Sequence, residues 1–194
     1  KHFDTDHNSE TFSESKMFEL LPRIWKNMDE PFADPSLLPT FLLSHFTNQQ
    51  VKVCLSGDGA DEIFAGYPTY LAHKITSLMP RQLYGLINKT SSILPVSHRN
   101  MSFDFKLRQF SRGLRYGRKE RHQYWLGSFK NNEKQKHYVK DFKKLLSSKN
   151  NLKQIIKNYS NELNDWEIGL KQDFNFYLTD DMLVKIDRTS MANS

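Results

Sequence analysis

The sequence lacks the features that mark several classes of protein. Its 194 residues include one cysteine, Cys54, so no internal disulfide can form. It has no run of about 20 mainly apolar residues, which excludes a membrane-spanning helix. Eight glycines and seven prolines are too few for a collagen-like or low-complexity chain. There is also no internal repeat and no Cys/His cluster with zinc spacing.

The composition that remains is typical of a soluble, globular protein. Hydrophobic residues make up 38% of the chain and aromatic residues 13%, which is enough for a core and argues against intrinsic disorder. The length fits one domain or a piece of a larger one. Residues 1–14 are polar and contain no secretory signal, so we expect a cytoplasmic protein. A net charge of +6 supports nucleic-acid binding only weakly.

The amino-terminal part predicts an α/β fold. Apolar residues recur at helical spacing over residues 17–28, and Asp34-Pro35 is a good start for a second helix. Residues 51–55 are short, β-branched and mostly apolar and precede a glycine turn, so they predict a buried strand. Residues 61–71 predict another helix, with a break near residues 66–68. This order of elements is typical of a layered fold with a parallel sheet.

The carboxyl-terminal part predicts helices alone. We expect them at residues 83–87, 105–114, 124–129, 142–159 and 163–178. The whole chain is therefore predicted to be one helix-rich α/β domain, incomplete, with a partial parallel sheet. Its α/β part would cover about residues 1–79 and a helical layer about residues 80–194.

One segment directly after the predicted strand could carry chemistry. It consists of Ser56, Gly57, Asp58, Gly59, Ala60, Asp61 and Glu62. Ligands of open α/β sheets bind beside the carboxyl ends of strands. The glycines allow a tight turn, the serine hydroxyl and the loop N–H groups can donate to a phosphate, and the acids can hold Mg²⁺. A plain turn with acids at a helix start explains the same residues equally well.

Three ordered stretches resemble glutamine-hydrolysing asparagine synthetases. They are residues 29–36 (Asp-Glu-Pro-Phe-Ala-Asp-Pro-Ser), residues 55–67 (Leu-Ser-Gly-Asp-Gly-Ala-Asp-Glu-Ile-Phe-Ala-Gly-Tyr) and residues 180–194, which contain Asp-Asp-Met-Leu-Val-Lys-Ile-Asp-Arg and Ser-Met-Ala-Asn-Ser. Residues 1–7 are similar as well, and the middle of the chain resembles the family loosely. The resemblance implies a synthetase domain of the ATP-pyrophosphatase type, with an adenine-nucleotide α-hydrolase-like sheet.

The resemblance also implies an ATP-dependent ligase of asparagine biosynthesis. Such an enzyme adenylates the β-carboxylate of aspartate with Mg-ATP. Ammonia, released from glutamine in a separate glutaminase domain, then attacks the mixed anhydride, which has the good leaving group that a carboxylate lacks. The protein positions the reactants and neutralises phosphate charge. The implied cofactors are ATP and Mg²⁺, and the implied partners are aspartate, or another carboxylate, and ammonia.

Carried over by position, the resemblance gives the loop residues roles. Ser56, Gly57 and Gly59 would bind ATP. Asp58 would act in forming the aspartyl-adenylate, although the family often has the longer Glu at this position. Asp61 would bind Mg²⁺ or pyrophosphate.

Four further residues have two interpretations each. They are Glu62, Lys185, Asp187 and Arg188. The resemblance would put them near the substrate side of the site. For Glu62 a place at the helix start is expected as well, and for the other three a structural salt bridge is at least as good an interpretation.

Parts of the family pattern do not occur in these residues. The phosphate-binding loop Ser-Gly-Gly-x-Asp-Ser and the glutaminase cysteine are missing, and Cys54 would be a small apolar residue of the predicted strand. The motif at residues 180–194 stops before Leu-Glu-x-Arg-x-Pro-Phe-Leu-Asp. We therefore expect an internal fragment of a synthetase domain that has no activity alone.

Other functions fit some of the same residues. A relative could amidate another carboxylate or close a β-lactam, and a non-catalytic scaffold of the same fold would look alike. Arg108, Arg112 and Arg115 share one helical face that could follow phosphates in a helical nucleic-acid-binding module, but a solvated helix explains them better. We expect no nucleic acid and no membrane as partner, and the sequence leaves a homo-oligomer open.

Overall fold

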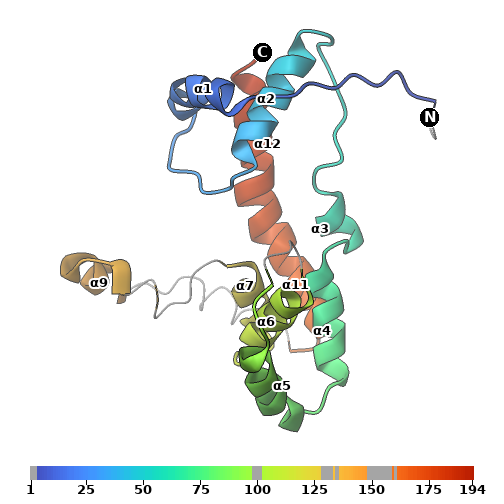
Figure 1. Cartoon of the computed structure of the whole chain (residues 1–194), viewed down its shortest axis with the longest axis vertical. Helices are drawn as coiled ribbons and strands as arrows, with labels where there is room; N and C mark the ends of the chain where they lie inside the picture. Colours follow the sequence, from blue (N-terminus) through green and yellow to red (C-terminus); the bar gives the residue numbers. More distant parts are fainter. Residues whose placement is uncertain (1–3, 98–101, 128–132, 134–135, 148–158, 160) are drawn as a thin grey trace. The chain divides into compact units, whose positions relative to one another are not determined.

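A computed structural model describes residues 4–97, 102–127, 133, 136–147, 159 and 161–194. The chain divides into two compact units (helices labelled in Figure 1). Unit 1 consists of Lys1–Ala60 and Asn175–Ser194, and unit 2 consists of Asp61–Phe174. The boundary that we expect near residue 79 divides an α/β part from a helical part. The two units are divided by their contacts instead, so they do not test this boundary, and it stays a prediction.

Unit 1 is built around helix α2 (Leu37–Asn48), which packs against α1 (Glu14–Lys26) and α12 (Leu183–Met191). Its small core consists of Ile24 from α1 with Leu37 and Phe41 from α2. Partly buried apolar residues surround this core, namely Leu20, Met28, Phe32, Leu38 and Ala192. The beginning and the end of the chain are thus held together through α2.

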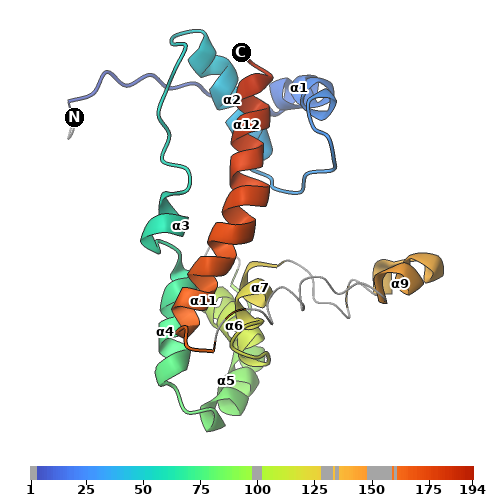
Figure 2. The same cartoon turned by 180° about the vertical axis from the view of Figure 1, so that it is seen from behind.

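The strand predicted at residues 51–55 is not formed. Among the described residues no strand occurs, and these residues run as a single trace between α2 and α3 (Ala60–Phe64; Figure 2). Val53 is 83% exposed and Leu55 99%, and Cys54 is exposed as well, so it is not a packed apolar residue. A strand needs a neighbour to accept and donate its backbone hydrogen bonds. The described part of the chain supplies none, so the helix-rich character is confirmed and the parallel sheet is not.

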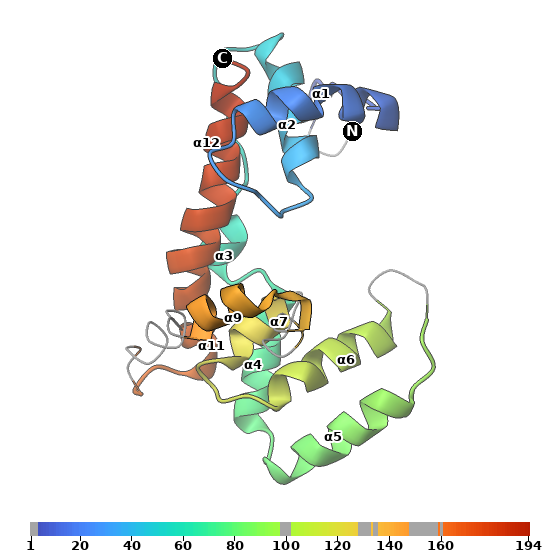
Figure 3. The same cartoon turned by 90° about the vertical axis from the view of Figure 1, so that its left-hand side faces the viewer.

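Unit 2 is helical, as the carboxyl-terminal pattern predicts. Its elements are α3, α4 (Pro68–Leu78), α5 (Gln82–Ile93), α6 (Phe103–Leu114), α7 (Arg121–Leu126), α9 (Lys140–Ser147) and α11 (Asp165–Gln172). A π-helix, η1 (Asp173–Met182), follows α11. Helices α5 and α6 lie side by side (Figure 3), α7 packs on α6, and α11 packs on α4. Part of the helix predicted at residues 142–159 lies outside the described residues.

No helix of the described residues combines the length and the apolar character needed to cross a membrane.

Helix α4 begins with a proline at its first position, where no backbone N–H is required. The break predicted near residues 66–68 therefore lies where the sequence placed it.

The end of α3 depends on a residue with an unfavourable backbone conformation. The Gly66 N–H donates to the Asp61 carbonyl at 3.0 Å, and Ala65 between them has a φ of 57°. This is the pattern of a Schellman cap, in which glycine is the usual residue because it has no Cβ. Ala65 therefore adopts the left-handed conformation at a cost that glycine would avoid.

Four buried polar side chains form a hydrogen-bonded chain inside unit 2. Asp173 accepts from the Tyr70 hydroxyl at 2.7 Å and contacts His122 Nε2 at 2.7 Å. His122 Nδ1 lies 3.0 Å from His73 Nε2, and the Trp125 ring meets His73 edge-on. Burial, together with the charges of His122 and Arg121, lowers the pKa of His73 to about 3. The chain links α4, α7 and the start of η1 in one unit.

Replacing Ala65 by glycine is expected to stabilise the protein. The substitution removes the strain of the left-handed conformation, and the free energy of unfolding should rise by about 0.5–1 kcal/mol. The matched control, Ala72→Gly inside α4, should lower it by a similar amount, since glycine is a poor helix former. Urea unfolding of the three proteins measures both changes, and a loss of stability in Ala65→Gly would contradict the cap.

The depressed pKa of His73 predicts that unit 2 loses stability in acid. Below pH 6.5 the unfolded histidine binds a proton that the folded one does not bind until about pH 3. The free energy of unfolding should therefore fall from pH 6.5 to pH 4, by up to about 1.4 kcal/mol per pH unit. The slope should be shallower in His73→Gln and unchanged in the control His7→Gln. Equal slopes in all three proteins would contradict the assignment.

Candidate functional site

The loop that the sequence singles out contains a tight turn in unit 1. The Gly57 carbonyl accepts from the Ala60 N–H at 3.2 Å, and Gly59 has a φ of 85°. A positive φ at the third position of a turn is typical of type II and favours glycine. A Cβ on Gly59 would also lie 3.0 Å from Leu178 Cδ1. The backbone conformation thus favours glycine at residue 59, as the sequence predicts for a tight turn, and a Cβ there would also require the Leu178 side chain to shift.

The other predicted ATP-binding residues lie on the open side of this turn. Ser56, Gly57 and Asp58 are exposed, and a Cβ on Gly57 would meet no atom within 4 Å. The space beside the Gly57 backbone is therefore free to receive a ligand. The serine hydroxyl and the N–H groups of such a turn are the donors that a phosphate requires.

The acids of the loop differ in their surroundings. Asp61, which follows the boundary between the units, is exposed and packs against Gly66, where a Cβ would come within 1.9 Å of Asp61 Oδ1. Glu62 is buried, and its Oε1 accepts from the Tyr67 hydroxyl at 2.5 Å. Glu62 is thus placed for a structural role at the start of α3. In the described part of the chain no three His, Cys, Asp or Glu side chains gather as metal ligands.

Lys185 is a buried ion-pair partner. It is 4% exposed, and its ammonium donates to Asp34 Oδ2 at 2.7 Å and to Ser36 Oγ at 2.6 Å. Burial opposes the charge of Asp34, but the bonds from Lys185 and Ser36 outweigh it and hold the pKa of Asp34 below its ordinary value. The ion pair joins α12 to the turn that precedes α2. Of its two interpretations, the salt bridge is the one that the contacts support.

A second carboxyl group lies beside this pair. Burial and the negative charge of Asp34 raise the pKa of Asp181, while Lys185 acts in the opposite direction. Asp181 Oδ1 has no hydrogen-bond partner among the described residues. Asp34 and Asp181 are 147 positions apart in the sequence, and no local pattern indicates that they would lie together.

The remaining candidates lie on the surface of α12. Arg188 pairs with Asp29 across partly exposed side chains, and Asp187 is exposed. Further along, Asn193 contacts the Phe41 carbonyl at 3.4 Å and His45 Nδ1 at 3.2 Å. The first and the third of the stretches that resemble asparagine synthetases, residues 29–36 and 180–194, therefore pack together in unit 1.

Comparison with known proteins extends the resemblance from single motifs to the whole sequence. The sequence model of the asparagine synthase family matches residues 1–194, which is the whole chain. The chain belongs to the asparagine synthase family. The resemblance seen in the three stretches is thereby confirmed, and it extends through the helical middle, where the sequence resembles the family only loosely.

The curated relatives are much longer than this chain. Glutamine-hydrolysing asparagine synthetase 1 of Bacillus subtilis is 28% identical over 194 residues, which cover 96% of this chain and 28% of the relative. A provisionally named glutamine-hydrolysing asparagine synthetase of Mycobacterium tuberculosis is 37% identical over 99 residues, which cover 50% of this chain and 15% of the relative. No solved structure matches significantly. The chain thus spans less than a third of these relatives.

The basic face of α6 makes contacts within the chain. Arg108 donates to the Leu94 carbonyl, Arg115 Nε to Asn88 Oδ1 at 3.3 Å, and Arg112 to Gln109 at 3.4 Å. The bonds of Arg108 and Arg115 link α5 and α6 through residues in these helices or directly after them, whereas the bond of Arg112 lies within α6. Their contacts favour the solvated, structural interpretation of the stripe over a nucleic-acid interface.

Removal of the Lys185 charge tests the structural assignment. Lys185→Met leaves the Asp34 carboxylate without its cation, and the free energy of unfolding should fall by about 2–3 kcal/mol. Breaking a fully buried ion pair costs about 3–5 kcal/mol. We expect a smaller loss of stability here because the Asp34 side chain is partly exposed to water. Arg188→Met, at a more exposed pair, should cost at most about 1 kcal/mol. Urea unfolding of both variants measures the difference, and equal losses would contradict it.

Proposed function

We propose that this chain is part of an ATP-dependent, amide-forming ligase that makes asparagine from aspartate. Adenylation of the β-carboxylate would create the leaving group, and ammonia released from glutamine elsewhere in the parent protein would displace it. The single observation that carries the proposal is the family match over the whole chain. The name of the Bacillus subtilis relative supports aspartate as acceptor and glutamine as the source of ammonia.

The turn after residues 51–55 is the part of this chain best suited to the nucleotide. Its exposed Ser56 hydroxyl and its N–H groups would donate to phosphate oxygens, and the open side of Gly57 would allow close approach. Gly59 holds the turn in shape. Small residues in the turn would thus leave room for the phosphates beside the N–H groups, while the acids follow in the sequence.

The exposed acids Asp58 and Asp61 would act at the phosphate groups and at the metal ion. Asp58 would lie beside the reacting phosphoryl group, and Asp61 would hold Mg²⁺ through a carboxylate oxygen, the kind of ligand that this ion prefers. When bound, Mg²⁺ neutralises phosphate charge and stabilises pyrophosphate as it leaves. Lys185 and Arg188 would act indirectly, by joining α12 to residues 29–36.

An ATP–pyrophosphate exchange assay on the full-length protein tests the proposal. Exchange should depend on aspartate and not on other amino acids, sugar acids or peptides. Asp58→Asn should lower the aspartate-dependent rate about a hundredfold or more, as expected for loss of a group that acts on transition-state charge. Glu19→Gln, which removes an exposed carboxylate from α1, is the matched control and should keep the full rate.

Other results would decide against the proposal or narrow it. Exchange that depends on a different carboxylate would replace aspartate as the acceptor, and an unchanged rate in Asp58→Asn would remove this residue from the site. The 194-residue chain alone should give a background rate, because the family's phosphate-binding loop is not among its residues. Clear turnover by the chain alone would contradict that expectation.

A further inference from the structure

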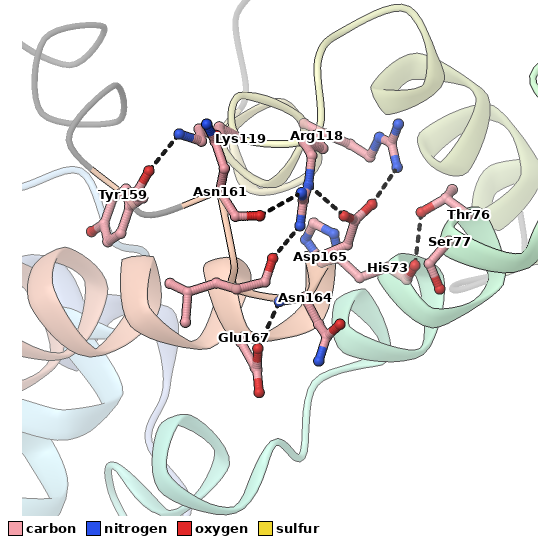
Figure 4. Close-up of polar contacts among 12 residues, drawn as sticks. His73, Thr76, Ser77, Arg118, Lys119, Tyr159, Asn161, Asn164, Asp165 and Glu167 are labelled. Carbon is pink, nitrogen blue, oxygen red and sulfur yellow. Dashed lines mark hydrogen bonds and ion pairs between the residues drawn. The ribbon is translucent and has the colours of Figure 1, made fainter.

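Unit 2 contains a pocket that plays no part in the proposed reaction. It has a volume of about 820 Å³ and lies where the end of α4 meets the starts of α5, α7 and α11. Figure 4 shows Arg118, Asp165 and the α4 residues Thr76 and Ser77 in this region. Pockets of about 300–1,000 Å³ are the usual size for small-molecule ligands.

The pocket carries an excess of positive charge. Its lining includes four cationic side chains, Lys74, Arg81, Arg118 and Arg121, and one acidic side chain, Asp165. The Asp165 carboxylate is shared, since it lies 2.7 Å from Arg118 Nε and 3.4 Å from Arg121 Nη1. One carboxylate cannot neutralise two guanidinium groups, so the part of the pocket lined by Arg118, Arg121 and Asp165 keeps a positive charge.

The other two cations, Lys74 and Arg81, pair with no carboxylate of the described residues. Lys74 and Arg81 are exposed, and in the part of the chain that the structure describes neither side chain makes a hydrogen bond or an ion pair. They come from the second half of α4 and from the residue before α5, whereas Arg118 and Arg121 come from the residues before α7 and from its start. The cations that line this pocket thus come from different elements of unit 2.

The Arg121 guanidinium is buried against two aromatic rings. Arg121 is 5% exposed, and its guanidinium lies over the rings of Tyr84, at 5.7 Å, and Trp125, at 5.9 Å. Within the described part of the chain its guanidinium donates one hydrogen bond, to Asp165, and its buried Nε has no partner there. A guanidinium fixed by rings loses little freedom when an anion binds, and it keeps donors for that anion.

Aromatic surface adjoins the cations. Trp166, which follows Asp165 at the start of α11, lines the pocket and is 39% exposed. Tyr84 lines it as well. A planar ring can stack on such a side chain, while a phosphate on the same ligand meets the cations. Inorganic phosphate would use the charges and leave the ring surface empty.

We propose that this pocket binds a nucleotide-like organic phosphate, with the phosphate among Lys74, Arg81 and Arg121 and the planar ring on Trp166. The residues involved are different from those of the turn at Ser56, and the ligand is bound rather than consumed. Such a site would make the protein respond to the level of a phosphorylated metabolite.

Binding of adenosine monophosphate to the full-length protein without Mg²⁺ tests this proposal. Calorimetry should detect binding, and the fluorescence of Trp166 should change on titration. Adenosine and inorganic phosphate should each bind about tenfold or more weakly, because each supplies half of the contacts. Trp166→Phe should abolish the fluorescence change. A ligand that binds no better than phosphate would overturn the proposal.

Variants separate this pocket from the proposed active site. Lys74→Gln with Arg81→Gln should weaken binding of adenosine monophosphate about tenfold or more, while the control Lys16→Gln with Lys26→Gln on α1 should bind as the unchanged protein does. Asp58→Asn should keep the fluorescence response of Trp166. If the unchanged full-length protein shows no aspartate-dependent exchange but its Trp166 fluorescence still responds to adenosine monophosphate, the proposed function fails and the pocket stands. Unchanged binding in the Lys74/Arg81 double variant would overturn the pocket alone.

Discussion

The buried ammonium of Lys185 is the constraint on which unit 1 depends. An ammonium that is 4% exposed costs several kcal/mol unless a carboxylate and further hydrogen bonds compensate it. Asp34 and Ser36, which precede α2, are the groups that do so. The pair therefore sets which turn of α12 faces the start of α2, and Arg188 on α12 and Asn193 just beyond its end reach partners of their own. Residues 29–36 and residues 180–194, which are far apart in the sequence, are thereby held in contact.

The sequence predicted features of this structure that depend on neighbouring residues. The tight turn at Gly59 and the break near residues 66–68 depend on conformations that only certain residues adopt easily, and both are found. The second helix was expected to begin at Asp34-Pro35, but it begins at Leu37. Asp34 instead accepts from the Ser36 N–H in a turn and binds Lys185, a partner that no local pattern shows.

Features that depend on distant residues could not be predicted. The pattern of residues 51–55 correctly describes what a buried strand contains, but strand formation also needs a neighbour to pair with, and the segment is exposed. In the same way, His73 and His122 are 49 positions apart, and their bond follows from the packing of helices in unit 2. The candidate loop could be located from the sequence because its chemistry is contiguous, whereas the surroundings of Lys185 could not.

The basic side chains fall into two groups according to whether they bond to other groups of the chain. A nucleic-acid interface needs rows of cations that face outward without partners, yet Arg108 and Arg115 on α6 bond to groups of the chain itself. Their charge therefore stabilises the fold. Lys74 and Arg81 differ, because they are exposed, uncompensated in the described part of the chain and gathered at one pocket. The excess of positive charge is mild over the whole sequence, but four cations line this one pocket. Charge gathered at a single pocket favours a compact phosphorylated ligand over a polyanion.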